Sequence, residues 1–365
     1  MLEQLKKYRM DLHQIPELGF EEYKTKAYLM EAIQSLGCTI HEVGETGLVL
    51  YFGYGKEKTI AFRADMDALP IREATGLAFS SLHNGLMHAC GHDGHMAVLL
   101  GLAHYIHKQS QTLDKNVVLV FQPSEERDAG AHVIVRSGLL EKYQVEAIFG
   151  LHLWPGLEKG TLHSRANELM AMGSEVTITL HGKSVHVADS EKGIDALYLA
   201  CRYLNDLYEM EAALPKDVYR LLKFGACQSG NVRNAISDQT TLDGTLRSFK
   251  DETHHHLKTQ LREIADHYEQ AYNCQINIDY NDGYDAVIND PELLQQIRTQ
   301  IPAIKLLENP VMQSEDFGLY RKTCPSLFFF LGVGNTAPLH NDQFDFDMAV
   351  LQRGLDLWIT ILELY

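Results

Sequence analysis

The chain has 365 residues, of which 45% are hydrophobic and 22% are charged, as is typical of a folded globular protein and not of a disordered one. Its length suggests two domains and allows a large core without disulfides. With 32 Lys and Arg against 49 Asp and Glu, the formal net charge is −17. This acidity argues against nucleic acid or an anionic membrane as the main partner, although a local cationic pocket can still bind an anionic substrate.

The cysteines and the N-terminus indicate a cellular location. Six cysteines are scattered without a CxxC pair, which fits a reducing compartment and not a disulfide framework. The first 20 residues are charged and interrupted by Pro16, so we see no secretory signal. No apolar run approaches the ~20 residues of a membrane helix. We therefore expect a cytoplasmic protein that does not act at a membrane.

The two ends of the chain predict an α/β domain with a largely buried sheet. An amphipathic helix is expected first, and the last expected element is also a helix. Between them, short runs rich in Val, Ile, Leu and Phe alternate with helical stretches, as in layered α/β folds. The expected helices span residues 21–36, 95–108, 131–140 and 347–364, and the expected strands span 48–52, 59–62, 117–121, 147–151 and 327–333.

The middle of the chain has a different pattern. Residues 174–181 and 274–280 alternate polar and apolar side chains, and 238–246 is a further strand candidate. Helical patterns at 194–212 and 252–272 separate these strands. Half-exposed strands with two helices predict a small α+β domain whose sheet has one solvated face. We expect this lid-like domain at residues 170–281, inserted into a catalytic domain made of residues 1–169 and 282–365.

Polar side chains follow four of the expected apolar strands. Asp65 and Asp67 follow the second strand, the Glu125–Glu126 pair follows the third, His152 follows the fourth, and His340 comes after the last. In an open α/β sheet, ligands bind beyond the carboxyl ends of the strands. These side chains are therefore expected to meet at one edge of the sheet.

The string HACGHDGH at residues 88–95 adds candidate metal ligands. Cys90 and His92 are close enough to bind one ion or an adjacent pair, and thiolate with imidazole suits zinc and similar metals. The alternative is a helix N-terminus with an incidental buried cysteine. Spacing alone does not exclude His88 or His95 as ligands. The run His254–His256 is expected on a solvated helix face.

The pair Glu125–Glu126 suits metal-assisted hydrolysis. Successive side chains of an extended segment point to opposite sides, so one carboxylate can bind a metal while its neighbour faces a water. A bound ion lowers the pKa of that water from about 15.7 toward ~7, and the second carboxylate can then remove its proton. The alternative is that the pair merely caps the helix that follows.

Taken together, these motifs resemble the M20 family of metallopeptidases, in its amidohydrolase branch. The resemblance extends over nearly the whole chain in a fixed order, and the string HACGHD is its most specific part. The matching segments are DLHQIPEL (11–18), RADMDALP (63–70), HACGHDGH (88–95), FQPSEE (121–126), GLH (150–152), GKSVH (182–186), DGTLR (243–247), SEDF (314–317) and LHN (339–341).

The resemblance implies a fold and a cofactor. The fold is a zinc-peptidase-like catalytic domain with a mixed, largely buried sheet, and an inserted α+β, ferredoxin-like lid through which members commonly form homodimers. The cofactor is a pair of divalent ions, and mixed S, N and O ligands admit zinc, manganese, cobalt or nickel. The implied metal ligands are Cys90, His92, Glu126, His152 and His340.

The resemblance also assigns roles around the metals. Glu125 is the implied general base, and Asp67 is a carboxylate that orients a ligand. His186 on the lid is the implied donor to the tetrahedral oxyanion, with a surface-loop histidine as the alternative. Asn234 and Arg247 are the implied groups for the substrate carboxylate, although Arg247 can equally be a structural ion pair.

The expected reaction is hydrolysis of an N-acyl amino acid, first of all an N-acetyl one, to a carboxylate and a free amino acid. N-acetyl-diaminopimelate is one candidate substrate, and dipeptides and hippurate-like compounds are alternatives. A non-catalytic relative that binds metal or an amino acid is a second class, against which the intact Glu125 argues. A dinucleotide oxidoreductase is excluded because no GxGxxG follows the first strands.

Overall fold

The computed structural model describes residues 1–127 and 129–365, and these residues form two compact units. The first unit comprises Met1–Leu169, Val287–Pro310 and Asp316–Tyr365, and the second comprises Met170–Ala286 and Val311–Glu315. Among the described residues, no helix has both the length and the apolar character needed to cross a membrane.

The first unit is built on an eight-stranded sheet in the order β1-β2-β4-β3-β5-β14-β6-β13. The neighbours β4, β3, β5 and β14 run parallel, whereas β1, β2 and β6 join by antiparallel pairing, so the sheet is mixed. The strands are β1 (Thr39–Val43), β2 (Gly47–Phe52), β3 (Thr59–Asp65), β4 (Asn116–Gln122), β5 (Val145–Pro155), β6 (Leu162–Ser164), β13 (Lys305–Leu306) and β14 (Ser326–Gly334).

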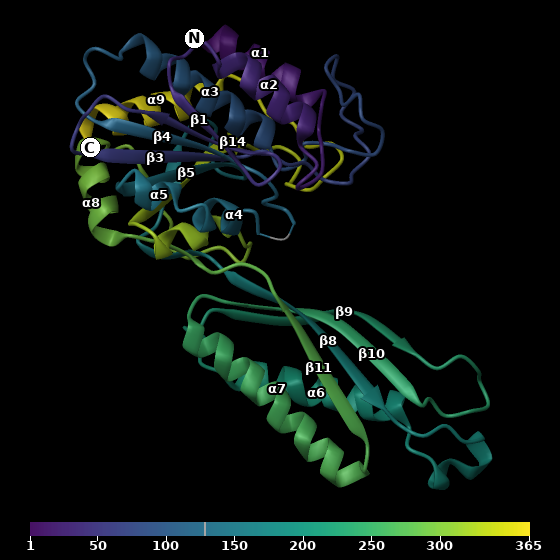
Figure 1. Ribbon diagram of the computed structural model, residues 1–365. Helices are drawn as coiled ribbons and strands as arrows, with labels where there is room; N and C mark the ends of the chain where they lie inside the picture. Colours follow the sequence, from purple (N-terminus) through teal and green to yellow (C-terminus); the bar gives the residue numbers. More distant parts are fainter. Residues whose placement is uncertain (128) are drawn as a thin grey trace. The chain divides into compact units, whose positions relative to one another are not determined.

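Helices cover both faces of this sheet, with α1, α2, α3 and α9 on one face and α4 and α5 on the other (Figure 1). The central strands are buried along their whole length because both faces are covered. The helices are α1 (Leu2–His13), α2 (Tyr23–Ile33), α3 (His92–Lys108), α4 (Ala131–Arg136), α5 (Leu139–Lys142), α8 (Pro291–Gln300) and α9 (Val350–Leu364), with a 3-10 segment η2 (Asp316–Lys322) and a small sheet of β7 (Asn167–Met170) and β12 (Val287–Asn289).

The second unit has a four-stranded antiparallel sheet in the order β11-β8-β10-β9, with α6 and α7 packed on one face (Figure 1). Alternate residues of β8, namely Val176, Ile178 and Leu180, are buried under these helices. The elements are β8 (Met172–His181), β9 (Arg220–Ser229), β10 (Gln239–Ser248), β11 (Gln275–Asp282), α6 (Ala196–Ala213), α7 (Asp251–Tyr272) and the 3-10 segment η1 (Val187–Lys192). The predicted fold class, a mixed α/β domain with an α+β unit, is confirmed.

Among the elements that differ from the sequence-based expectation are three helices of the first unit, α4, α5 and α1. The helix expected over 131–140 is two short helices, because Gly138 adopts a left-handed conformation with φ of 66° between α4 and α5. The first helix, α1, was not expected, since its sequence is rich in charged residues. One of these, Arg9, is buried and donates to Asp93 and Asp345.

His13, at the end of α1, forms a buried pair with the carboxylate of Asp93 at 2.7 Å. Burial alone would lower the pKa of His13, but Asp93 and Glu73 outweigh it and raise this pKa to about 9. A pKa raised above the ordinary 6.5 stabilises the fold fully below pH 6.5, and this contribution is lost as the pH rises through 9.

We therefore expect His13→Asn to lower the free energy of unfolding by roughly 3 kcal/mol at pH 6 and by much less at pH 10. Urea unfolding of both proteins at the two pH values measures this difference. The exposed His255→Asn serves as the control and should show no such pH dependence. A His13→Asn deficit that stays constant with pH would show that His13 is not charged in the folded protein.

Candidate metal centre and active site

The parallel strands β4, β3, β5 and β14 bring the predicted polar side chains to one edge of the first unit. Asp65 ends β3, the Glu125–Glu126 pair follows β4, and His152 lies near the end of β5. His340 follows β14 and is tied to the Cys90 segment, because its backbone N–H donates to the carbonyl of Ala89 at 2.9 Å. The carboxyl ends of neighbouring parallel strands are the usual ligand site of such sheets.

Cys90 and His92 lie on either side of Gly91, the residue that precedes α3. Gly91 has a φ of 85°, a left-handed conformation that favours glycine. This turn brings the Cys90 Sγ to 3.4 Å from Nε2 of His152. Ligand atoms of Cys90, His92 and His152 all lie within 4.8 Å of one another, and all three residues are buried.

Both buried histidines hold the tautomer that a metal needs. Nδ1 of His92 lies 2.9 Å from the carbonyl oxygen of Asp67, and Nδ1 of His152 lies 2.7 Å from that of Leu153. A carbonyl can only accept, so each Nδ1 carries a proton, and in the neutral ring the lone pair is then on Nε2. Nε2 of His92 is buried without a hydrogen-bond partner among the described residues, as expected for a metal ligand.

Three further groups of metal-binding size overlap the first. They are Asp65 with His92 and His95, Cys90 with Glu126 and His340, and His92 with Glu125 and Glu126. Nε2 of His340 lies 3.1 Å from Oε1 of Glu126. Cys90 belongs to two of these groups, so its sulfur is close to both sets of candidate ligands.

The electrostatics of the cluster favour a cation. Burial, reinforced by Glu126 and Glu125, raises the pKa of the Cys90 thiol well above its usual range. Burial and the neighbouring His95 hold the pKa of His152 well below its usual range, so its imidazole is neutral. A divalent cation would reverse the first effect by stabilising the thiolate and would benefit from the second. The donor set therefore fits divalent metal ions.

Asp67 holds the turn that carries the two glutamates. Its Oδ1 accepts from the N–H of Glu125 and its Oδ2 from the N–H of Glu126, both at 2.9 Å. The backbone carbonyl of Asp67 accepts from Nδ1 of His92. Asp67 is thus fully buried between two ligand-bearing segments and is placed to orient them.

The two histidines that spacing left open have different environments. Nδ1 of His95 lies 2.6 Å from Oδ1 of Asp65, and its Nε2 accepts from the N–H of Leu153 at 3.0 Å. Both ring nitrogens are therefore used, and His95 supports the strand that carries His152. His88 is buried close to His13 and lies outside the ligand groups found among the described residues. The supporting role of Asp65 and His95 was not predicted, and the position of Asp65 at a strand end was the one indication of it.

The residues predicted to bind the substrate or its oxyanion, His186, Asn234 and Arg247, lie in the second unit. Two of them, His186 and Asn234, are neighbours. His186 pairs with Ala235 across a short bridge, and the N–H of Val187 donates to the carbonyl of Asn234 at 3.1 Å. Both His186 and Asn234 are exposed. Nδ1 of His186 accepts from the N–H of Ala188, which leaves the proton of the neutral ring on Nε2.

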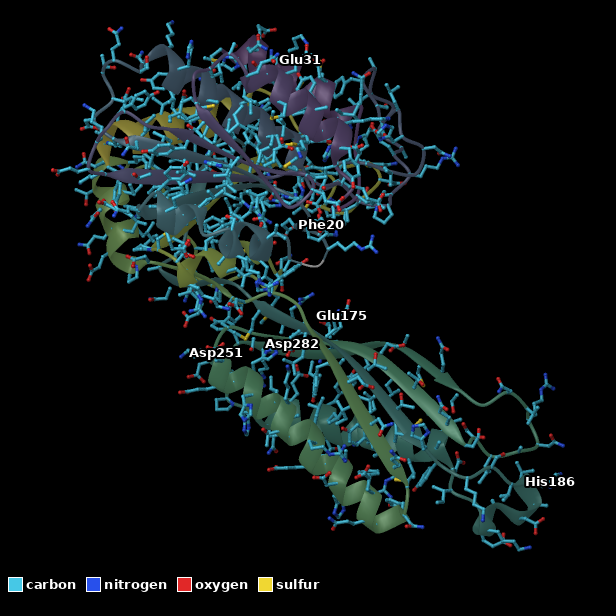
Figure 2. The ribbon with its side chains drawn as sticks, in the orientation of Figure 1. Phe20, Glu31, Glu175, His186, Asp251 and Asp282 are labelled. Carbon is cyan, nitrogen blue, oxygen red and sulfur yellow. The ribbon has the colours of Figure 1, made fainter. Side chains whose placement is uncertain are left out.

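Arg247 lies at the opposite end of the same sheet. It pairs with Gly173, whereas the other end of β10, at Gln239, pairs with His181 close to His186. Figure 2 shows His186 at one end of the second unit and Glu175 and Asp282 at the other. Arg247 is half-buried and donates to Oγ of Ser314 at 2.7 Å. The structure therefore brings His186 and Asn234 together but places Arg247 away from them.

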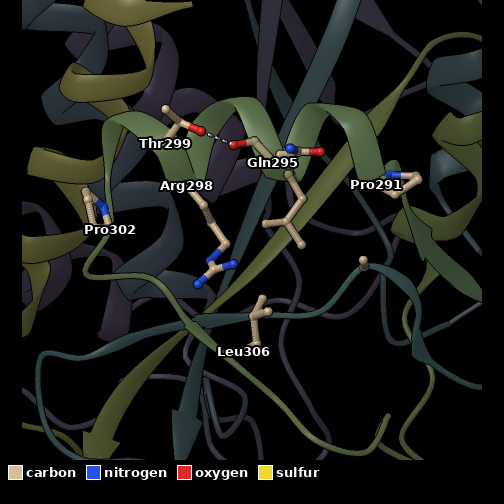
Figure 3. A pocket seen from close by; sticks show the side chains of 8 residues that line it. Pro291, Gln295, Arg298, Thr299, Pro302 and Leu306 are labelled. Carbon is tan, nitrogen blue, oxygen red and sulfur yellow. Dashed lines mark hydrogen bonds between the residues drawn. The ribbon is translucent and has the colours of Figure 1, made fainter.

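A separate groove of about 460 Å³ lies along α8 in the first unit (Figure 3). Arg298 points into it, with its Nε donating to the carbonyl of Ile304 at 3.2 Å, and Pro291, Pro302 and Leu306 form part of its wall. The groove shares no residue with the ligand cluster. We do not assign it to the candidate active site.

Known proteins resemble this chain over its full length. The profile of peptidase family M20/M25/M40 matches residues 61–364. The chain is 35% identical to an N-acetyldiaminopimelate deacetylase from Oceanobacillus iheyensis, with 99% of each chain covered. It is 34% identical to a protein of the same name from Streptococcus uberis, with 97% of each covered.

A solved structure agrees with these matches. The Bacillus subtilis YXEP protein, a dinuclear metal binding peptidase from the M20 family, is 29% identical and superposes with a TM-score of 0.86, covering 100% of this chain and 99% of that one. The family inferred from the sequence motifs is thus confirmed. The chain belongs to peptidase family M20/M25/M40 and is a hydrolase of amide bonds.

Proposed function

We propose that this hydrolase removes the acyl group, first of all acetyl, from an N-acyl amino acid, and that N-acetyl-diaminopimelate is its first candidate substrate. The observation that carries the proposal is the position of Glu125 among overlapping groups of candidate metal ligands, most of which are buried. Two relatives named N-acetyldiaminopimelate deacetylase support the substrate. The negative net charge and six free cysteines in the described chain support action on a small molecule in the cytoplasm.

The proposed site holds two divalent ions, for which Zn, Mn, Co and Ni are the candidates. When bound, such ions polarise the scissile carbonyl and lower the pKa of a water molecule. Cys90 would bind as a thiolate. The other proposed ligands are His92, Glu126, His152 and His340.

Glu125 acts as the general base in this proposal. It takes a proton from the attacking water as the new C–O bond forms, and it returns that proton to the nitrogen as the C–N bond breaks. The products are a carboxylate and a free amino acid. Asp67 keeps the base in place through the two backbone N–H groups of the turn. The Nε2–H of His186 is suited to donate to the oxyanion.

We also propose that the protein works as a homodimer through the second unit. Arg247 and Gln239 are eight residues apart on β10, about 26 Å at ~3.3 Å per residue, so one copy cannot place Arg247 and the His186–Asn234 pair on one small substrate. In a dimer, one copy could supply Arg247 and the other copy could supply the His186–Asn234 pair. Among the described strands, the edge strand β9 pairs with β10 alone. This edge and the exposed Leu197 and Tyr198 on α6 provide surfaces for association.

The first test replaces the proposed base. Glu125→Gln should lower kcat by about 10²–10⁴-fold because the amide cannot accept the proton of the water. Metal content should stay unchanged, as measured by elemental analysis of the same samples. The control is the exposed Glu57→Gln, which should keep full activity. Substantial turnover by Glu125→Gln would remove Glu125 from the role of base.

A second test concerns Cys90, the proposed thiolate ligand. Cys90→Ser should weaken metal binding by about 10–100-fold, since a neutral hydroxyl replaces the thiolate. Its circular dichroism should remain that of the wild type. Cys201→Ser, at an exposed cysteine of α6, is the matched control. If Cys90→Ser retains the metal affinity of the wild type, the sulfur is not a ligand.

A third test asks whether His186 acts on the site of a second copy. His186→Ala and Glu125→Gln should each be nearly inactive as homodimers. Co-expression of the two should restore about a quarter of wild-type activity, because half of the dimers are mixed and each has one complete site. If each copy used its own His186, no mixed dimer would have a complete site and no activity would return.

A further inference from the structure

The turn that carries Glu125 and Glu126 is held by buried carboxylates through three successive backbone N–H groups. Those of Glu125 and Glu126 donate to Asp67 at 2.9 Å each. The third, that of Ser124, donates to Oε1 of Glu22 at 2.8 Å. Asp67 therefore accepts from two of the three consecutive N–H groups, and Glu22 accepts from the third.

Ser124 needs such support because its backbone is in an unfavourable conformation. Its φ of 52° lies in the left-handed region, which residues with a Cβ seldom adopt. Its hydroxyl donates to the carbonyl of Arg127 across the same turn. The segment of Glu22 also packs tightly here, since a Cβ on Gly19 would lie 2.4 Å from Oγ of Ser124. Contacts with this segment thus hold the bend that directs the following residue, Glu125.

Glu22 is itself held rigidly. It is fully buried, and its Oε2 accepts from the hydroxyl of Thr46 at 2.6 Å. Two hydrogen bonds of Glu17 hold the segment that contains Glu22. The N–H of Thr25 donates to the Glu17 carboxylate at 2.9 Å, and the N–H of Ala68 donates to the Glu17 carbonyl at 2.8 Å. The second of these bonds joins the Glu22 segment to the residue that follows Asp67.

The two hydrogen bonds of Glu22 do not require a charge. Burial, with a contribution from Asp67, raises the pKa of the Glu22 carboxyl to about 7. A protonated carboxyl still presents an oxygen to Ser124 and a hydroxyl to Thr46. A glutamine in its place would present an oxygen and an N–H in the same arrangement. The N–H of Ser124 therefore needs only an acceptor atom held at the position of Glu22 Oε1.

We propose that Glu22 is a positioning residue that sets the direction of Glu125 and Glu126 by fixing the backbone of Ser124. It contacts neither the ligand cluster nor a reacting group, and it acts through the turn alone. The inference rests on the proposed function for its effect on turnover. Its effect on the turn itself can be measured without activity.

The experiment compares Glu22→Ala with Glu22→Gln in the metal-loaded protein. Glu22→Ala should lower kcat for an N-acetyl amino acid by about 10–100-fold with KM within twofold, and zinc should pass to a chelator faster. Amide hydrogen exchange of the segment containing residues 124–126 should speed up by a similar factor. Glu22→Gln should stay within about threefold of wild type in all three measurements.

Two controls separate this role from general stability. Glu21→Ala changes the exposed neighbour and should leave all three measurements unchanged, and Thr46→Val removes only the second partner of Glu22 and should have an intermediate effect. Glu22→Gln as impaired as Glu22→Ala would overturn the proposal, as would a Glu22→Ala protein with unchanged exchange and zinc release. If the wild type released no amine, the proposed function would fail, whereas exchange and zinc release would still decide the role of Glu22.

Discussion

The need to neutralise a buried group of negative charges governs the candidate site. Asp65, Asp67 and Glu125 are buried, Glu126 is nearly so, and a cysteine lies among them. Charges removed from water are costly unless they are paired. Asp65 has Arg63 and His95 as partners, and Asp67 receives backbone N–H groups. The carboxylates of Glu125 and Glu126 each lie 3.9 Å from Nε2 of His92, and divalent cations would add positive charge at this point.

The sheet makes this concentration of charge possible. Four neighbouring parallel strands end at one edge, so each supplies a polar residue without any strand leaving the core. The strands themselves are apolar and covered on both faces, and they give the edge a rigid base. Short turns then aim the side chains, with left-handed residues at Gly91, Ser124 and His340. The strands therefore make the edge of the sheet rigid, and the turns set the directions of the side chains.

The fold class and the family were predictable because they rest on patterns that a single sequence displays. Apolar runs followed by acidic residues or histidine identify strand ends, and HACGHD is specific to the family. Helix α3 begins within three residues of the expected start at 95. In contrast, β9 was missed because half of its residues are exposed and they follow no alternating apolar pattern.

Contacts between distant segments were not predictable from the pattern. The pairing of His95 with Asp65 explains why that histidine is not a free ligand, and only the folded chain brings the two together. The carboxyl of Glu22 meets Ser124 across 102 residues of sequence. Similarly, Arg247 and His186 appear as one set of substrate groups in the sequence, whereas strand β10 places them at opposite ends of a sheet. The roles of all ten candidate residues, and the lid boundaries at 170 and 281, stay predictions.

Amine release from a panel of N-acyl amino acids and dipeptides tests whether this protein is a metal-dependent deacylase. Metal-stripped protein would be measured beside samples refilled with zinc, manganese, cobalt or nickel, with folding and metal content checked in each. We predict no release without metal, and release with at least one metal that is fastest from N-acetyl amino acids, among them N-acetyl-diaminopimelate. Equal release from stripped and refilled protein, or none from folded and fully loaded protein, would contradict the account.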